Sequence, residues 1–243
     1  MTVVGALERA CGKTYWATVG ILAWAVVVGG LGIALSLGQE KEKQPLRVLE
    51  TIDLPLPRTK DGLLLDETLA QRRSVRKFTS QPLTMAEIGQ LVWAAQGITE
   101  PVRGLRTAPS AGATFPLEIY LVAPDGAFHY LAKGHRLERL SGANLRSAIA
   151  GSNQDYVRDA ALDIVITAVI ARTEPKFKDQ ATRYVYFETG HAAQNVLLQA
   201  TSLGLGAVCV GGIAEEKVRQ ALALPSDRQP LYIVSIGHPQ VQK

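Results

Sequence analysis

The sequence predicts a single α+β domain that follows one long apolar segment. β-Branched and alternating runs indicate strands, and apolar residues at helical spacing indicate helices. The two kinds of element follow each other without strict βαβ alternation, which favours α+β over a parallel α/β sheet. The 243 residues leave room for one medium domain. The predicted divisions are an N-terminal segment 1–14, a transmembrane helix 15–38, a linker 39–62 and the domain 63–243.

Composition narrows the classes of function. The formal charge is only +4, and no block of Lys and Arg is interleaved with aromatic residues, so nucleic-acid binding is not expected. Cys11 and Cys209 are the only cysteines, which excludes a disulfide framework. The histidines are scattered and form no ligand pair, so no metal site is predicted.

The apolar segment is long enough to cross a bilayer. Residues 15–37 carry no charge, and 23 residues at about 1.5 Å rise span about 34 Å. The alternative is a cleaved signal peptide, although the apolar core of such a peptide is usually about 7–15 residues. Basic residues are nearly balanced across the span, and no twin-arginine pair precedes it. These features predict a single-pass membrane protein with its catalytic domain on the cytoplasmic side.

Local signals divide the rest of the chain into elements. Charges and prolines in residues 39–62 predict an extended tether. Asp66 can cap a short helix, and Thr84 with Glu87 forms a capping box that opens a helix ending at Gly97. Helices are also predicted over 175–202 and 215–222, and strands over 117–123, 127–131, 161–171, 207–210 and 231–236.

The densest cluster of candidate binding residues is the basic run at residues 72–78. It places four cations and one hydroxyl within seven residues. Arginine forms paired, charge-assisted hydrogen bonds with phosphate oxygens. In an extended segment Arg72, Ser74 and Arg76 point to the same side. The run therefore predicts a phosphate site, and a solvated basic turn is the alternative.

Two further segments are rich in small residues. One is the loop 109–118, which includes Ser110, Ala111 and Gly112, and the other is the pair Gly211-Gly212 after a short strand. Small residues let the backbone lie close to a flat ligand, and adjacent glycines leave main-chain N–H groups accessible. Turns use glycine freely, so each segment alone is a weak signal.

Taken together, these motifs resemble the SagB-type branch of the nitroreductase superfamily. The resemblance extends over residues 52–239. It implies a nitroreductase-like FMN-binding fold, with a central mixed sheet flanked by helices, and a homodimer with FMN at its interface. The matching motifs are RRSVRKF at 72–78, WAAQGIT at 93–99, PSAGATFPLE at 109–118, RY at 183–184, GHAAQN at 190–195 and GLGAVCVGG at 204–212.

The resemblance also implies a role for each small motif. The basic run would hold the phosphate and ribityl chain of FMN, the small-residue loop would lie beside the isoalloxazine, and the glycine pair would face flavin N5 and O4. The residues in these three groups are Arg72, Arg73, Ser74 and Arg76, then Ser110, Ala111 and Gly112, and then Gly211 and Gly212.

Proton transfer is the function of a Lys-Tyr pair in the azoline dehydrogenases of this branch, and the matching positions here are Lys176 and Phe177. Phenylalanine cannot exchange a proton, which leaves Lys176 as the candidate catalytic residue. A solvated lysine at a helix start is the alternative. Phe115 likewise stands where the family usually has tyrosine.

The predicted function is that of a membrane-anchored, FMN-dependent oxidoreductase that transfers a hydride at flavin N5 on a small-molecule or peptide substrate. One alternative is an NAD(P)H-dependent nitro or quinone reductase. Another is an accessory flavin-binding subunit of a larger membrane complex.

Overall fold

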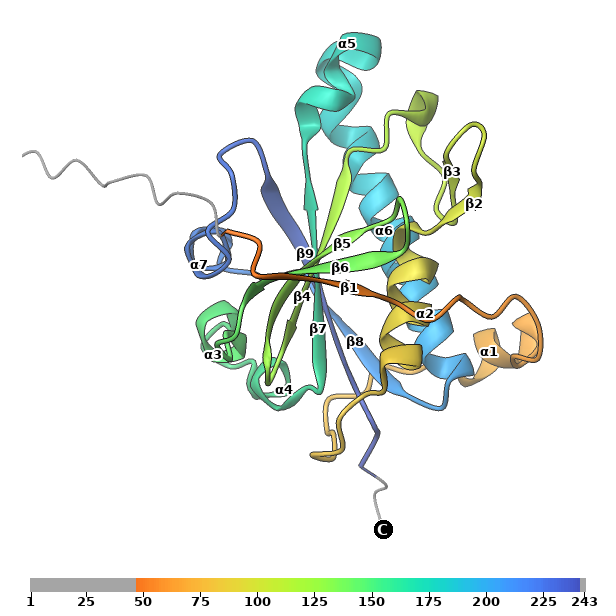
Figure 1. Cartoon of the computed structure of the whole chain (residues 1–243), viewed down its shortest axis with the longest axis vertical. Coiled ribbons are helices and arrows are strands. Elements are labelled where there is room, and N and C mark those ends of the chain that lie inside the picture. The colour runs from red at the N-terminus through yellow and green to blue at the C-terminus, as the bar shows by residue number, and fades with distance from the viewer. Residues whose placement is uncertain (1–46, 241–243) are drawn as a thin grey trace, which may run out of the picture. The chain divides into compact units, whose positions relative to one another are not determined.

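A seven-stranded antiparallel sheet forms the centre of the domain (Figure 1). The computed structural model describes residues 47–240. The strands follow the order β1-β6-β5-β4-β7-β9-β8, and β2 and β3 form a separate hairpin. Their bounds are β1 Glu50–Asp53, β2 Ile98–Glu100, β3 Leu105–Arg106, β4 Leu117–Ala123, β5 Gly126–Leu131, β6 Arg136–Ser141, β7 Leu162–Ala168, β8 Gly206–Val210 and β9 Gln229–Gly237.

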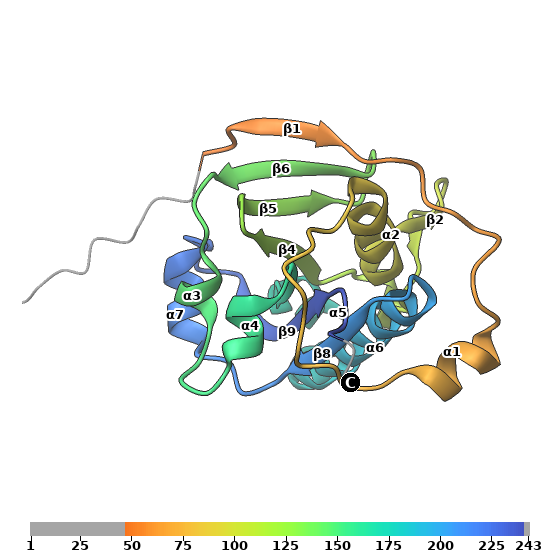
Figure 2. The ribbon, with the colours of Figure 1, turned by 90° about the horizontal axis from the view of Figure 1, so that it is seen from below.

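Helices cover both faces of this sheet (Figure 2). The two longest, α2 (Met85–Gln96) and α6 (Ala181–Ser202), bury one face, and α1 (Leu65–Gln71) packs against α6. The short helices α3 (Arg146–Ile149), α4 (Asp155–Asp159) and α7 (Glu215–Ala221) bury the other. All seven residues of β7 are buried, because helices cover the sheet on both sides of it.

Most of the predicted elements are confirmed. Strand β4 has the predicted bounds, and β5, β8 and β9 differ from prediction by one or two residues at their ends. The capping box that begins α2 is present, since Thr84 Oγ1 accepts from the Glu87 N–H at 3.2 Å. The predicted strand 161–171 ends at Ala168, where the chain turns into a short 3-10 helix.

Two local predictions are wrong, and a third is refined. Part of the predicted linker, Glu50–Asp53, is the edge strand β1, which pairs with the unpredicted strand β6. The helix predicted over 175–202 is two helices, α5 (Glu174–Phe177) and α6, because Lys178 between them has a φ of 49°. The predicted mixed sheet is refined rather than wrong: all ladders between named strands are antiparallel, and the parallel pairing is the bridge of Ser74 with Ala207.

The prediction of a membrane location is corrected. Across residues 47–240, no helix combines the length and the apolar character needed to cross a bilayer. Helix α6 has 22 residues, but charged and polar side chains interrupt it. The predicted span at 15–38 lies outside the described residues.

Candidate active site

The predicted phosphate-binding run lies beside the first residues of β8. The Val75 N–H donates to the Ala207 carbonyl at 3.0 Å, and Ser74 forms a parallel bridge with the same residue. The Val75 side chain packs on Gly206, where an added Cβ would lie 2.6 Å from Val75 Cγ1. Because side chains alternate along an extended segment, Ser74 and Arg76 point away from this contact.

The cations of this run have no acidic partner within the described part of the chain. Arg73 donates to the carbonyls of Ala70 and Arg72, and the Arg76 guanidinium lies 5.9 Å from the centre of the Tyr156 ring. None of the ion pairs between described residues involves Arg72, Arg73 or Arg76. Exposed arginines beside a serine hydroxyl fit a phosphate group.

The glycine pair follows β8 and is exposed. The Gly212 carbonyl accepts from Gln154 Nε2 at 2.7 Å, and no atom lies within 4 Å of an added Cβ at this residue. An added Cβ at Gly211 would lie 3.3 Å from the Tyr232 ring. This open backbone fits the edge of a flat ring. We call Arg72, Arg73, Ser74, Arg76, Gly211 and Gly212 the phosphate half-site.

The small-residue loop is held by α5 and α6. Gly112 has a φ of 58°, which favours glycine, and its carbonyl accepts from Lys176 Nζ at 2.6 Å. The Ala111 N–H donates to Glu188 Oε1 at 2.8 Å. Burial raises the pKa of Glu188, and the hydrogen bonds from Ala111 and Ser110 partly oppose this effect. We call Ser110, Ala111 and Gly112 the loop half-site.

The basic run of the phosphate half-site and the loop half-site lie at opposite ends of the sheet. The glycine pair follows Val210, which pairs with Ile233 and through it with Val165, nearer the end of the loop half-site. Ala207, beside the phosphate half-site, pairs with Ile236, which pairs with Leu162 at the start of β7. The loop half-site leads into Leu117, which pairs with Ala168 at the end of β7. In Figure 1 the loop before β4 is at the top near α5, and the segment between α1 and α2 is at the bottom. One chain therefore does not bring the basic run and the loop half-site together.

The two phenylalanines that replace family tyrosines are packed against other side chains. Phe177 contacts Tyr184 edge to face, with ring centres 4.9 Å apart. Phe115 lies under the Arg106 guanidinium at 5.1 Å, and its carbonyl accepts from Arg172 at 3.1 Å. The phenol of Tyr184, which belongs to α6, therefore lies next to Phe177, the position where the family usually has tyrosine.

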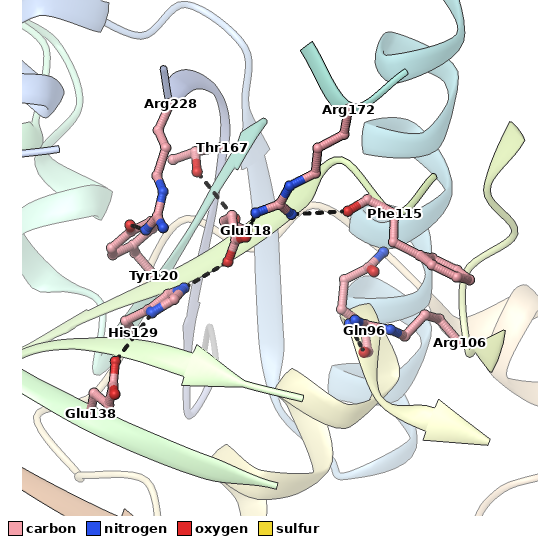
Figure 3. Close-up of polar contacts among 10 residues, drawn as sticks. All are labelled: Gln96, Arg106, Phe115, Glu118, Tyr120, His129, Glu138, Thr167, Arg172 and Arg228. Atoms are coloured by element: carbon pink, nitrogen blue, oxygen red, sulfur yellow. Dashed lines mark hydrogen bonds and ion pairs between the residues drawn. The ribbon is translucent and has the colours of Figure 1, made fainter. Parts of the chain in front are cut away.

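A polar cluster that the sequence did not predict lies on the sheet near the loop half-site (Figure 3). The His129 Nε2–H donates to one oxygen of Glu118 at 2.8 Å, and Arg172 donates to the other at 2.5 Å. Burial would raise the pKa of Glu118, but these two partners more than offset it and lower the pKa to about 2. In the sequence, the signal that could have revealed this cluster is Glu118, a charged residue near the start of an otherwise apolar strand.

Comparison with known proteins identifies the family. The sequence pattern of the nitroreductase family matches residues 69–238. The chain belongs to the nitroreductase family. A nitroreductase of Methanocaldococcus jannaschii is 37% identical over 196 residues, which cover 77% of this chain and 97% of that protein. Membership in the family confirms the prediction of an oxidoreductase of the nitroreductase type that uses a flavin.

A solved structure supports the fold. A nitroreductase from Ralstonia eutropha JMP134 has a TM-score of 0.74 and 31% identity, and the match covers 82% of this chain and 99% of that one. The predicted nitroreductase-like α+β fold is therefore confirmed.

More distant relatives of the family have named activities. The FMN reductase (NADPH) of Bacillus subtilis is 27% identical over 194 residues, and the match spans 71% of this chain but only 65% of the reductase. The microcin B17-processing protein McbC of Escherichia coli is 24% identical over 155 residues, or 57% of its length.

Proposed function

We propose that this chain is an FMN-dependent oxidoreductase that works as a homodimer, with each FMN bound between the phosphate half-site of one chain and the loop half-site of the other. The observation that carries this proposal is the placement of the basic run and the loop half-site, which suit different parts of FMN, at opposite ends of the same sheet. A second copy, turned about a two-fold axis, supplies the half-site that the first copy lacks.

Each half-site suits a different part of FMN. Arg72, Arg76 and the Ser74 hydroxyl would bind the phosphate, because they are donors without acidic partners. The exposed Gly211 and Gly212 amides would face the edge of the isoalloxazine. The loop half-site would cover the isoalloxazine ring. The ammonium group of Lys176 holds the backbone of this loop in place through the Gly112 carbonyl.

The bound flavin supplies hydride transfer at N5. The protein residues would bind and orient the ring and exchange protons with the substrate. Lys176 is the candidate for proton exchange, because its ammonium group already contacts the loop that would lie beside the ring. We propose a small molecule or a peptide as the substrate, and the match to McbC supports the SagB-type branch and its peptide chemistry.

Flavin binding tests this proposal through a matched pair of variants. Arg76→Gln removes a proposed phosphate contact, whereas Lys77→Gln makes the same charge change one residue along an extended segment, where the side chain points the other way. We expect Arg76→Gln to weaken FMN binding about tenfold or more, measured by flavin fluorescence, and Lys77→Gln to leave it nearly unchanged. Wild-type protein that takes up no FMN, or equal losses in the two variants, would contradict the proposal.

NAD(P)H-dependent reduction is the second candidate function. It is favoured by the similarity to the FMN reductase (NADPH) of B. subtilis. Anaerobic mixing of the flavin-loaded protein with NADPH or NADH separates the two candidates. Rapid loss of flavin absorbance supports a nitro or quinone reductase. An oxidised flavin that persists supports a dehydrogenase that takes its electrons from the substrate.

A further inference from the structure

A cavity of about 750 Å³ opens beside the first residues of β4. Its walls come from the end of α2, the β2–β3 hairpin, the turn between β5 and β6, and the short 3-10 helix after β7. Figure 3 shows Gln96, Arg106 and Arg172, three of the residues that line it. This volume is in the range of sites that hold small organic ligands, about 300–1,000 Å³.

The lining of this cavity has an excess of positive charge. It includes Arg106, Lys133, Arg136 and Arg172, and Glu118 is its only acidic residue among those described. Glu118 pairs with Arg172 and with His129. No ion pair within residues 47–240 involves Arg106, Lys133 or Arg136. The cavity therefore has three cationic side chains that form no ion pair among the described residues.

Buried polar atoms in the lining also lack partners. Arg106 Nε and Arg136 Nε are buried donors, and Gln96 Oε1 is a buried acceptor, and none of them has a hydrogen-bond partner. Burial lowers the pKa of Arg106, and the nearby Tyr130 and Glu118 oppose this effect only in part. Leaving a buried polar atom unpaired costs about 1–3 kcal/mol, so these atoms mark places where ligand atoms would stabilise the fold.

The remaining wall is apolar. Leu117, Ile119 and Leu131 line it, and the ring of the buried Tyr130 lies next to them. The Tyr130 hydroxyl already bonds to His135 Nδ1 at 2.9 Å. This side of the cavity therefore suits the hydrocarbon or aromatic part of a ligand rather than a second charged group.

We propose that this cavity binds an organic oxyanion, a small molecule that joins a carboxylate or phosphate group to an apolar body and carries a hydrogen-bond donor. The oxyanion pairs with Arg106 and Arg136, and the donor faces Gln96 Oε1. The site is separate from the proposed flavin site, since the residues of the two half-sites are not among those that line the cavity. Phe115 connects the two regions, because Arg106 and Arg172 both contact it.

Calorimetry on the flavin-loaded protein tests this proposal, because bound flavin occupies the other phosphate site. The probes are 4-hydroxybenzoate and 4-hydroxyphenyl phosphate, with the uncharged 4-hydroxybenzamide as the matched control ligand. We expect one or both anions to bind, and to bind at least about tenfold more tightly than the amide. The anion that binds more tightly shows whether the site prefers carboxylate or phosphate. Equal binding of the amide and both anions, or no binding of either anion, would overturn the proposal.

Variants locate the binding within the molecule. Arg106→Gln and Arg136→Gln should each weaken anion binding about tenfold. Arg103→Gln is the control, because this exposed arginine lies on the same hairpin as Arg106 but pairs with Glu100 outside the cavity. Two independent variants are used in case one of them does not fold. Arg76→Gln should leave anion binding unchanged, which separates this site from the flavin site. Unchanged binding in folded Arg106→Gln and Arg136→Gln proteins would contradict the assignment.

Discussion

Asp163 has no exposed surface and lies within β7. Its Oδ1 accepts from Ser235 Oγ at 2.5 Å, and its Oδ2 is buried without a partner. Burial raises the pKa of this carboxyl well above its usual value. The unfolded carboxyl loses its proton near pH 4, whereas the folded one keeps it. Asp163 therefore lowers the stability of the fold progressively as the pH rises from about 4 toward neutrality.

Replacing Asp163 with asparagine tests this effect. The asparagine side chain keeps the acceptor for Ser235 but cannot ionise, so we expect Asp163→Asn to be more stable than the wild type at pH 7, and close to it at pH 4. Urea unfolding at several pH values measures the difference. The exposed Asp125→Asn is the control and should show no such gain. A gain that is equal at both pH values would show that the carboxyl does not stay protonated in the fold.

The sequence predicted some candidate site residues and missed others, because some lie close together along the chain and others meet only in the fold. Arg72, Ser74 and Arg76 stand in one short run, so their shared chemistry is visible without the fold. The cluster of Glu118 and Arg172 joins residues 54 positions apart, and only the pairing of β4 with β7 brings them together. Contacts across strands leave no local pattern in a single sequence.

Among the elements, helix α2 shows how a local signal can fix a boundary. Thr84 Oγ1 accepts from the Glu87 N–H, and Glu87 Oε2 accepts from the Thr84 N–H at 2.6 Å. We expect Thr84→Ala to lower the free energy of unfolding by about 0.5–2 kcal/mol, because it leaves a helix donor unpaired. Thr84→Ser keeps the hydroxyl and should cost much less. Denaturant midpoints of the two variants measure this, and an equal loss in both would show that the cap is not the cause.

Elements without such a signal were missed. Strand β6 has only two leucines, which are three residues apart and so do not alternate, and three of its six residues are Arg or Glu, so it has a weak strand pattern. Strand β1 is only four residues long and mostly exposed. Each is stabilised by the other through an antiparallel ladder at the edge of the sheet. Their existence depends on that pairing rather than on the preference of either segment alone.

For the whole molecule, exposed apolar side chains indicate where the proposed second copy would pack. Tyr186 and Phe187 on α6 are each 51% exposed, and they directly precede Glu188, which holds the loop half-site. Leu64, beside α1, and Leu65 within it are 70% and 63% exposed. Helix α1 packs against α6, and Leu65 lies beside Asn195 and Leu198, several turns along α6 from Tyr186 and Phe187. Adjacent exposed aromatic side chains such as Tyr186 and Phe187 commonly mark protein interfaces.

A double variant on α6 tests the dimer and the shared flavin site together. If the two half-sites of each flavin site come from different chains, Tyr186→Ser with Phe187→Ser should shift the protein toward monomer in sedimentation velocity and weaken FMN binding in parallel. Val102→Ser is the control, since Val102 is 93% exposed but lies on the turn between β2 and β3. A monomer that binds FMN as tightly as the wild type would show that one chain suffices for the site. A dimer unaffected by the double variant would place the interface on another face.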